Sequence, residues 1–233
     1  MQFIINDHIL KDYPQLFIGL IVVKDIDNEG NNTDIDRLLK EIQSETKLRY
    51  KGLDVTQHPH VIPWREAYSK FGAKPREFRC SAEALLRMVL NGRELKHINK
   101  LVDLYNYISL KYTLTVGGED LDTIKGDLVL AYADGTEPFV ALGQTENDTP
   151  LKGEVVYKDN LGVVCRRWNW REGDRTKLEE HTKNAVVVLE GIPPIENSVI
   201  EQATYELSKL IHKYCAGSVE VTFLNSVKPS VIL

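Results

Sequence analysis

Cysteine is scarce in this chain of 233 residues, and its three copies, Cys80, Cys165 and Cys215, lie far apart. An odd number of cysteines without a CxxC pair argues against a disulfide framework and against a zinc knuckle. Long apolar runs are missing too, because the most apolar one, Leu16 to Val23, has about a third of the length that a membrane-spanning helix needs. Residues Met1 to Asp7 lack the basic and apolar regions of a signal peptide. We therefore expect a protein of the reducing cytoplasm with no membrane partner.

A surplus of basic charge is also absent. The net charge is −5 and the pI is near 5.7, whereas proteins that coat duplex nucleic acid usually present a basic face. Duplex DNA is therefore not an expected partner, and any contact with RNA must be local. The sequence has no glycine-rich phosphate loop, GxSxG or HExxH motif. His58 and His60 flank Pro59 and have no third ligand nearby, so we expect no metal and no cofactor.

The order of the predicted elements indicates an α/β fold of the α+β kind. Hydrophobic residues make up 42% of the chain and charged residues 27%, as in ordinary globular proteins. We expect a single domain over residues 1–233, with a mixed, mostly antiparallel sheet flanked by helices. The predicted helices span residues 7–13, 33–42, 64–71, 82–90, 98–107 and 198–214. The predicted strands span residues 16–23, 128–132, 139–142, 154–157, 162–165, 185–189 and 218–223. The predicted N-caps are Thr33, Ser81 and either Asn197 or Ser198.

The densest functional signal is the segment 165–171, Cys-Arg-Arg-Trp-Asn-Trp-Arg. Planar guanidinium donors beside indole rings suit a carboxylate, a phosphate or a stacked base. The alternative is a structural cluster in which arginine packs on tryptophan. If the segment continues a strand, alternate side chains share a face, with Trp168 and Trp170 on one side. The other side would then carry Arg167, Asn169 and Arg171.

Four further places are candidate sites. Arg79 precedes a predicted helix start, where it could point at a ligand. Asn106 lies between tyrosines on a predicted helix, so its amide needs a backbone or ligand partner. Gly117, Gly118 and Glu119 fit either a helix N-terminus where glycines let the backbone close on a ligand, or a simple capped turn. Glu190 ends an apolar strand, where it could read a hydroxyl or an amine, or could be an exposed strand end.

Several of these segments occur together in a known order. They are WREAY at 64–68, SAEALLR at 81–87, LVDLYN at 101–106, VGGEDLD at 116–122 and the stretch from GEVVY at 153–157 to CRRWNWR. On these strings the chain resembles the stand-alone B3/B4-domain proteins, from about residue 64 to 194. It is similar, more remotely, to the editing region of the phenylalanyl-tRNA synthetase beta subunit.

The resemblance implies a B3/B4-like fold and a pocket for the aminoacyl end of a tRNA. In the synthetase the module hydrolyses tyrosine wrongly attached to phenylalanine tRNA. An asparagine of that pocket corresponds to Asn106, and the glutamate that senses the tyrosine hydroxyl corresponds to Glu190. A histidine and a phenylalanine of the synthetase fall on Gly117 and Glu119, and its glycine-rich wall falls on residues 166–171. These departures favour an anionic or strongly polar ligand.

Two functions remain open on the sequence. The first is an aminoacyl-tRNA binding and editing module that hydrolyses a mischarged ester in trans. Asn106 and the backbone at Gly117 and Gly118 would position the water, and Arg167 or Arg171 would stabilise the developing charge. The second is a non-catalytic protein that binds an amino acid or another small carboxylate through its arginines. The clamp would be formed by Arg166, Arg167 or Arg171.

Overall fold

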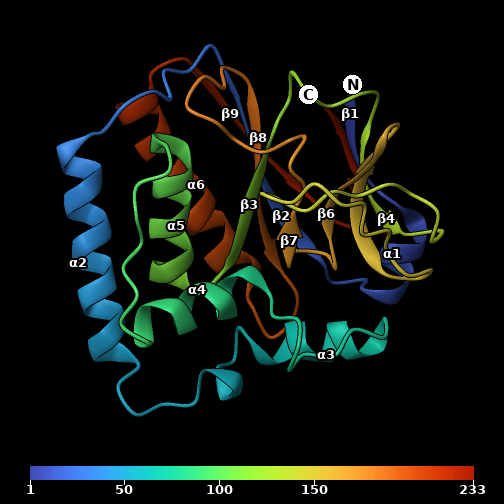
Figure 1. Ribbon diagram of the computed structural model, residues 1–233, viewed down its shortest axis with the longest axis horizontal. Coiled ribbons are helices and arrows are strands. Elements are labelled where there is room, and N and C mark those ends of the chain that lie inside the picture. Colours follow the sequence, from blue (N-terminus) through green and yellow to red (C-terminus); the bar gives the residue numbers. More distant parts are fainter.

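Two β-sheets pack face to face, and helices cover the outer face of one of them (Figure 1). The computed structural model describes residues 1–233. The four-stranded sheet has the order β3-β8-β2-β9, and all of its neighbouring strands are antiparallel. Its strands are β3 (Thr115–Asp120), β8 (Ala185–Gly191), β2 (Phe17–Lys24) and β9 (Ser218–Leu224).

The six-stranded sheet has the order β10-β1-β4-β5-β6-β7. Strand β1 runs parallel to β4, and every other pair in this sheet is antiparallel. The predicted fold class, α+β with mixed and mostly antiparallel pairing, is therefore confirmed. The strands are β10 (Ser230–Ile232), β1 (Gln2–Ile5), β4 (Leu128–Tyr132), β5 (Val155–Asp159), β6 (Gly162–Arg166) and β7 (Arg171–Glu172).

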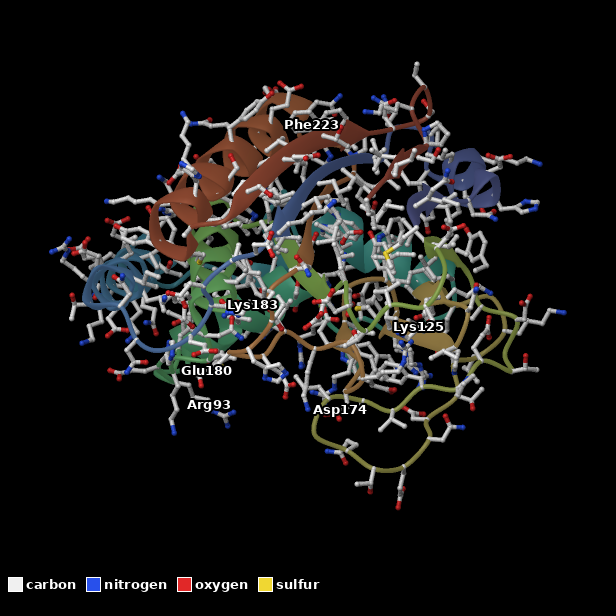
Figure 2. The ribbon with its side chains drawn as sticks, turned by 90° about the horizontal axis from the view of Figure 1, so that it is seen from above. Arg93, Lys125, Asp174, Glu180, Lys183 and Phe223 are labelled. Carbon is white, nitrogen blue, oxygen red and sulfur yellow. The ribbon has the colours of Figure 1, made fainter.

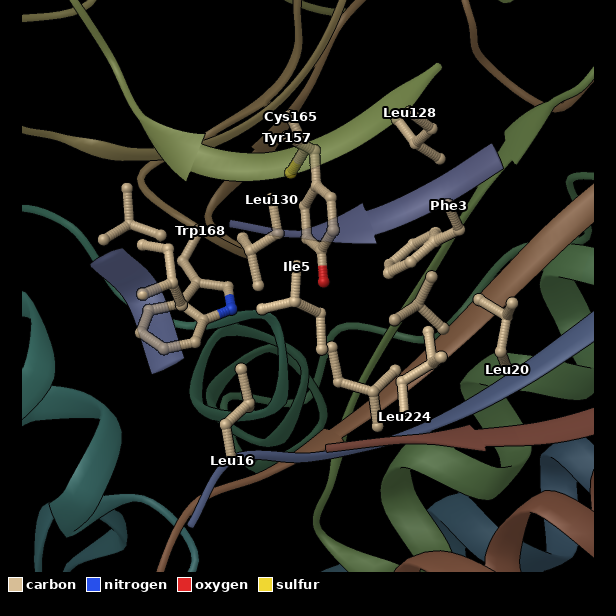
Figure 3. Packing of buried hydrophobic residues seen from close by; sticks show 14 of the residues in the cluster. Phe3, Ile5, Leu16, Leu20, Leu128, Leu130, Tyr157, Cys165, Trp168 and Leu224 are labelled. Carbon is tan, nitrogen blue, oxygen red and sulfur yellow. The ribbon is translucent and has the colours of Figure 1, made fainter. Parts of the chain in front are cut away.

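The larger apolar core lies between the two sheets. Alternation along β2 sends Leu20 to this core and Ile21 to the helices on the other side of the sheet. Figure 3 shows Leu20 and Leu224 of one sheet facing Phe3 of the other. Because β2 and β8 are buried on both faces, they are apolar from Phe17 to Val23 and from Ala185 to Leu189, and this explains why their runs predict strands so clearly.

Three long helices lie outside the four-stranded sheet: the second and third in chain order pack on its strands, and the first packs mainly against the second. They are α2 (Thr33–Arg49), α5 (Lys100–Tyr112) and α6 (Asn197–Cys215). The shorter elements are α1 (Asp7–Asp12), η1 (Val55–Gln57), α3 (Ile62–Lys70) and α4 (Ser81–Leu90). None of the helices combines the length and the apolar character that a membrane span requires.

Some local predictions were wrong. Residues 139–142 make only isolated bridges instead of a strand, and the two terminal strands β1 and β10, which pair with each other, were not predicted. Three residues predicted as N-caps, Thr33, Ser81 and Asn197, are instead the first residues of their helices, and Asn32, Cys80 and Glu196 occupy the cap positions. Of these three, Asn32 alone caps with its side chain. Asparagine and threonine are both good caps, so sequence alone does not choose between neighbours.

Candidate functional site

A small cavity lies between the two sheets, beside the start of α4. Its volume is about 40 Å³, which is room for a few water molecules or a small chemical group. Both sheets and the segment after β6 contribute to it, and Figure 3 shows Tyr157, Cys165 and Trp168 around this part of the interior. The lining residues are Ser81, Val116, Gly117, Gly118, Glu119, Leu128, Tyr157, Cys165, Trp168, Asn169, Glu172, Val188 and Glu190.

Glu190 of β8 organises one wall of the cavity. Its carboxylate accepts hydrogen bonds from the Tyr157 hydroxyl at 2.6 Å, from Nε1 of Trp168 at 2.6 Å and from Nδ2 of Asn169 at 2.9 Å. Burial raises the pKa of Glu190, and these three donors oppose that rise. The residue is 3% exposed, so the exposed strand end that the sequence allowed is wrong. The protein itself therefore supplies three hydrogen-bond donors to the Glu190 carboxylate.

Two other carboxylates, Glu119 and Glu172, also line the cavity. Burial raises the pKa of Glu119 well above its usual value, and the neighbouring Glu172 raises it further. Burial likewise raises the pKa of Glu172, to about 7. Part of the Glu172 side chain reaches solvent, but its Oε2 is buried and has no hydrogen-bond partner, and the same holds for Oε2 of Glu119. Burial beside Glu172 therefore favours the protonated, uncharged form of Glu119 at neutral pH.

The raised pKa of the buried Glu119 carboxyl predicts that Glu119→Gln stabilises the protein at neutral and alkaline pH. The folded protein holds the Glu119 proton more tightly than the unfolded chain, whose pKa is near the usual 4.5. Wild-type stability must therefore fall as the pH rises above 4.5, and the variant lacks that loss. We expect the variant to gain roughly 1–3 kcal/mol at pH 8 and little at pH 4.5.

Urea denaturation at both pH values measures this gain, with Glu146→Gln in an exposed loop as the control. An equal stability of the Glu119 variant and the wild type at pH 8 would contradict the burial of an uncompensated carboxylate.

The glycines next to Glu119 belong to strand β3 and not to a helix N-terminus or a capped turn, so that expectation was wrong. A β-carbon on Gly117 would lie 3.0 Å from Oε1 of Glu172, and one on Gly118 would lie 2.9 Å from the carbonyl oxygen of Val186. Gly117 thus leaves room for the Glu172 carboxylate, and Gly118 lets β3 approach β8 closely.

The segment 167–170 forms a turn between β6 and β7, so the alternation of a continuous strand was also wrong. Arg167 and Trp168 have φ values of 47° and 65°, in the left-handed region. As a result Trp168 turns inward, is fully buried, and packs edge-on against Trp64 and Tyr13. Asn169 bonds Glu190 and accepts from the Tyr68 hydroxyl, and its carbonyl accepts from the backbone N–H of Ser81 at the start of α4.

The arginines of this segment serve the protein's own interior. Arg166 makes a two-point ion pair with Glu154, with both N–O distances at 2.9 Å. Arg167 lies 3.2 Å from the same carboxylate and stacks on Phe78, with 3.7 Å between the guanidinium carbon and the ring centre. Neither residue lines the cavity. Arg79 also lies outside it, since its guanidinium bonds the Arg76 carbonyl.

Two open grooves meet the cavity at Glu172, which lines all three hollows. The arginine groove, about 280 Å³, carries the predicted residues Asn106 and Arg171. Its other lining residues are Ser81, Ala84, Leu85, Met88, Tyr105, Ser109, Val116, Asn169, Trp170 and Glu172. Arg171 is exposed, with its guanidinium carbon 5.5 Å from the centre of the Trp170 ring. The groove thus offers an aromatic face and a cation at the mouth of the cavity.

The acidic groove, about 590 Å³, lies on the other side of Glu172. Asp174, Glu179 and Glu180 line it together with Lys177 and His181. In Figure 2, Asp174 and Glu180 lie on the side of the molecule opposite to Phe223 of the edge strand β9. This groove is a poor surface for phosphates because acidic side chains predominate.

Sequence reasoning missed Glu172, Ser81, Tyr157 and Cys165 as cavity residues. A signal existed for two of them, because a hairpin of β5 and β6 places Tyr157 opposite Cys165. No signal existed for Glu172, since its strand has only two residues and reaches the cavity through the preceding turn.

Possible metal ligands also occur away from the cavity. Ligand atoms of Asp36, His97 and Asp103 lie within 4.8 Å of one another. Local contacts account for this group, because His97 and Asp103 bond each other at 2.5 Å and Asp103 accepts the backbone N–H of Ile98. His58 and His60 bond Tyr50 and the Tyr112 carbonyl respectively, which explains their conformations without a metal.

The family model of the B3/4 domain matches residues 63–216, well over half of the chain, so the chain belongs to the B3/4 domain family. The resemblance inferred from the sequence motifs is thereby confirmed, and the match extends beyond residue 194 through helix α6. No curated protein matches the chain. A solved structure similar to it is an N-terminal fragment of the phenylalanyl-tRNA synthetase beta subunit from Pyrococcus horikoshii, with 12% identity and a TM-score of 0.47. The similarity covers 93% of this chain and 49% of that one, so the chain spans about half the length of the fragment.

Proposed function

We propose that this site binds the aminoacyl end of a tRNA and hydrolyses the ester bond that joins the amino acid to the ribose. Membership of the B3/4 family supports the proposal. The observation that carries it is the charge of the cavity, where Glu119, Glu172 and Glu190 are present and no arginine is. A ligand end that enters this space cannot carry a free carboxylate, and an aminoacyl ester has none.

The same observation argues against the second function, the binding of a free amino acid or another carboxylate. Such a ligand would need Arg166 and Arg167, but Arg166 already pairs with Glu154 and Asp148, and Arg167 lies 3.2 Å from Glu154. Of the three arginines in the segment 165–171, only Arg171 is exposed. A carboxylate in the cavity would instead meet like charges in a poorly solvated space, which is unfavourable.

The arginine groove suits the nucleotide part of the ligand. Arg171 can pair with a phosphate, and Trp170, over whose ring the Arg167 guanidinium already lies at 4.5 Å, can contact a base beside it. This contact needs only the end of the RNA, which agrees with the net charge of −5. The acyl group would then lie at Glu172, where the groove meets the cavity.

The hydrolytic step requires a water and a group that takes its proton. The cavity has room for water, and a pKa of about 7 suits Glu172 to act as the base near neutral pH. The water oxygen attacks the ester carbon, and Glu172 takes a proton from the water. The bond to the ribose oxygen then breaks, and that proton passes to the ribose oxygen. Asn106, which lines the arginine groove together with Glu172, can orient the water.

The test is deacylation of a panel of correctly charged and mischarged tRNAs by the purified protein. We expect one or more pairs to be hydrolysed faster than in buffer, with a rate that rises as the pH passes 7 and Glu172 loses its proton. Glu172→Gln should lower this rate by about 100-fold, because a general base contributes at least that much. Glu146→Gln is the matched control and should keep the wild-type rate. If no tRNA is deacylated faster than in buffer, the hydrolytic function is wrong.

A further inference from the structure

Strand β9 is the outermost strand of the four-stranded sheet, and its outer side pairs with no other strand. Its seven residues, Ser218–Leu224, pair with β2 without a shift in register. No backbone hydrogen bond joins the other side of β9 to the rest of the protein. Because unpaired N–H and C=O groups along a strand can pair with another strand, this edge is a surface for association.

The outward groups of β9 follow from the alternation of hydrogen bonds across the sheet. The N–H of Leu121 bonds the Asn184 carbonyl, one pair beyond the end of the β3–β8 ladder. In antiparallel sheets, hydrogen-bonded pairs alternate with pairs that are not hydrogen-bonded. Counted from this pair through β8 and β2, the alternation turns the N–H and C=O groups of three β9 residues outward. They are Val219, Val221 and Phe223.

The other sheet edges have features that discourage the addition of a strand. In the six-stranded sheet, the edge strands β10 and β7 have three and two residues. In the four-stranded sheet, β3 ends with two acidic residues, and the N–H of Asp120 already bonds the Thr176 carbonyl. Strand β9 has the sequence SVEVTFL, without proline or lysine, and its pairing with β2 has no bulge. The β9 edge therefore lacks the features by which natural proteins prevent association.

We propose that two copies of this chain form a twofold dimer by antiparallel pairing of their β9 strands, with Val221 on the axis. In this register Val221 faces Val221 of the second copy, and Val219 faces Phe223. Since all three residues turn their backbone groups outward, each N–H meets a C=O of the other copy. The two four-stranded sheets then form one continuous sheet.

The same register brings opposite charges together. Leu224 belongs to the core between the two sheets, so Glu220 and Thr222, at alternate positions before it, face the same side of β9. Pairing about Val221 places Glu220 opposite Thr222 of the second copy. The Lys228 ammonium donates to Oγ1 of Thr222 at 2.9 Å. Each Glu220 carboxylate therefore approaches the Lys228 ammonium of the other copy, and no like charges face each other across the strands.

Aromatic surface flanks the β9 edge on the side of the helices. Tyr205 of α6 is 50% exposed and packs edge-on against Phe223, with 5.5 Å between the ring centres. Aromatic residues are enriched in protein interfaces. In Figure 2, Asp174 and Glu180 of the acidic groove lie on the side opposite to Phe223, so pairing through β9 leaves this groove open in both copies.

Sedimentation velocity of the full chain, from micromolar to hundreds of micromolar concentration, tests the dimer. We expect a species with twice the chain mass of 26.5 kDa, whose share grows with concentration. Val221→Pro should raise the dissociation constant by at least about 10-fold, because the central N–H is lost in both copies. Its own sheet tolerates this proline, since the Val221 N–H faces outward. Val221→Thr keeps the N–H and should stay within about 3-fold of the wild type.

A charge exchange tests the register. Glu220→Lys and Lys228→Glu each place like charges next to each other across the interface, so each should raise the dissociation constant by roughly 5-fold. The double variant restores opposite charges and should return to within about 2-fold of the wild type. Both positions are exposed, so these variants test the pairing even if Val221→Pro does not fold.

A monomer at every concentration overturns the inference and leaves the β9 edge to a partner of another sequence. A dimer that Val221→Pro does not weaken overturns it too, because the contact would then lie elsewhere. Single charge variants that associate like the wild type, or a double variant that recovers nothing, would show that the strands do not pair about Val221 and would also overturn it.

Discussion

Replacing Glu190 by alanine should lower the free energy of unfolding by roughly 3–6 kcal/mol, because three buried donors lose their acceptor at once. The donors are the Tyr157 hydroxyl, the Trp168 indole and the Asn169 amide. Each unsatisfied buried donor costs about 1–3 kcal/mol. No water-exposed alternative exists for Trp168, since its side chain is fully buried.

Chemical denaturation followed by tryptophan fluorescence measures this loss, because Trp168 is one of only three tryptophans. Glu190→Gln is the matched variant and should lose less, since its carbonyl oxygen still accepts from part of the donor set. Glu146→Ala in an exposed loop should stay within about 0.5 kcal/mol of the wild type. A loss below about 1 kcal/mol in Glu190→Ala would mean that Glu190 does not organise the wall.

Replacing Glu154 by alanine should lower the free energy of unfolding by roughly 3–5 kcal/mol, because the buried guanidiniums of Arg166 and Arg167 lose the carboxylate between them. Arg166 is 2% exposed and Arg167 is 7% exposed. Glu154 makes a two-point contact with the first and lies 3.2 Å from the second. Asp148 also pairs with Arg166, but it is mostly exposed and cannot compensate for the buried loss.

The control for this variant is an ion pair at the surface. Asp34 and Arg37 are both well exposed, so Arg37→Ala should change the stability by less than about 1 kcal/mol. Urea denaturation of both variants gives the comparison. Equal and small losses in the two would show that Arg166 and Arg167 find other partners, and the arginines would again be candidates for a ligand clamp.

The sequence predicted the secondary structure best where a strand is buried on both faces. The run around Leu20 and the run before Glu190 are apolar throughout, and this pattern predicts an interior strand. It predicted less where a short segment pairs with a distant one. Residues 2–5 became a strand because Phe3 and Ile4 pair with two strands that are distant in the sequence, β10 and β4. Such pairing leaves no local pattern.

The residues of the candidate site were also predicted only in part. Glu190, Trp168, Asn169 and Gly117 were predicted from the sequence and line the cavity. The arginines were predicted too, but Arg166 and Arg167 face Glu154 instead. Two residues with left-handed backbone, Arg167 and Trp168, reverse the direction in which each neighbouring side chain points. Because positive φ is uncommon for such residues, alternation along the segment was the natural expectation.

The sequence by itself determined the family, the class of fold and the chemical types gathered near the site, since these follow from motifs and from hydrophobic periodicity. Only the tertiary structure decided which charges face the ligand. The packing of the two sheets brings Glu119, Glu172 and Glu190 from three separate strands to one small cavity. It also buries the guanidiniums beside Glu154, because a buried cation must have a counter-charge within reach. The sign of the charge that the site presents to a ligand therefore depends on contacts between residues far apart in the chain.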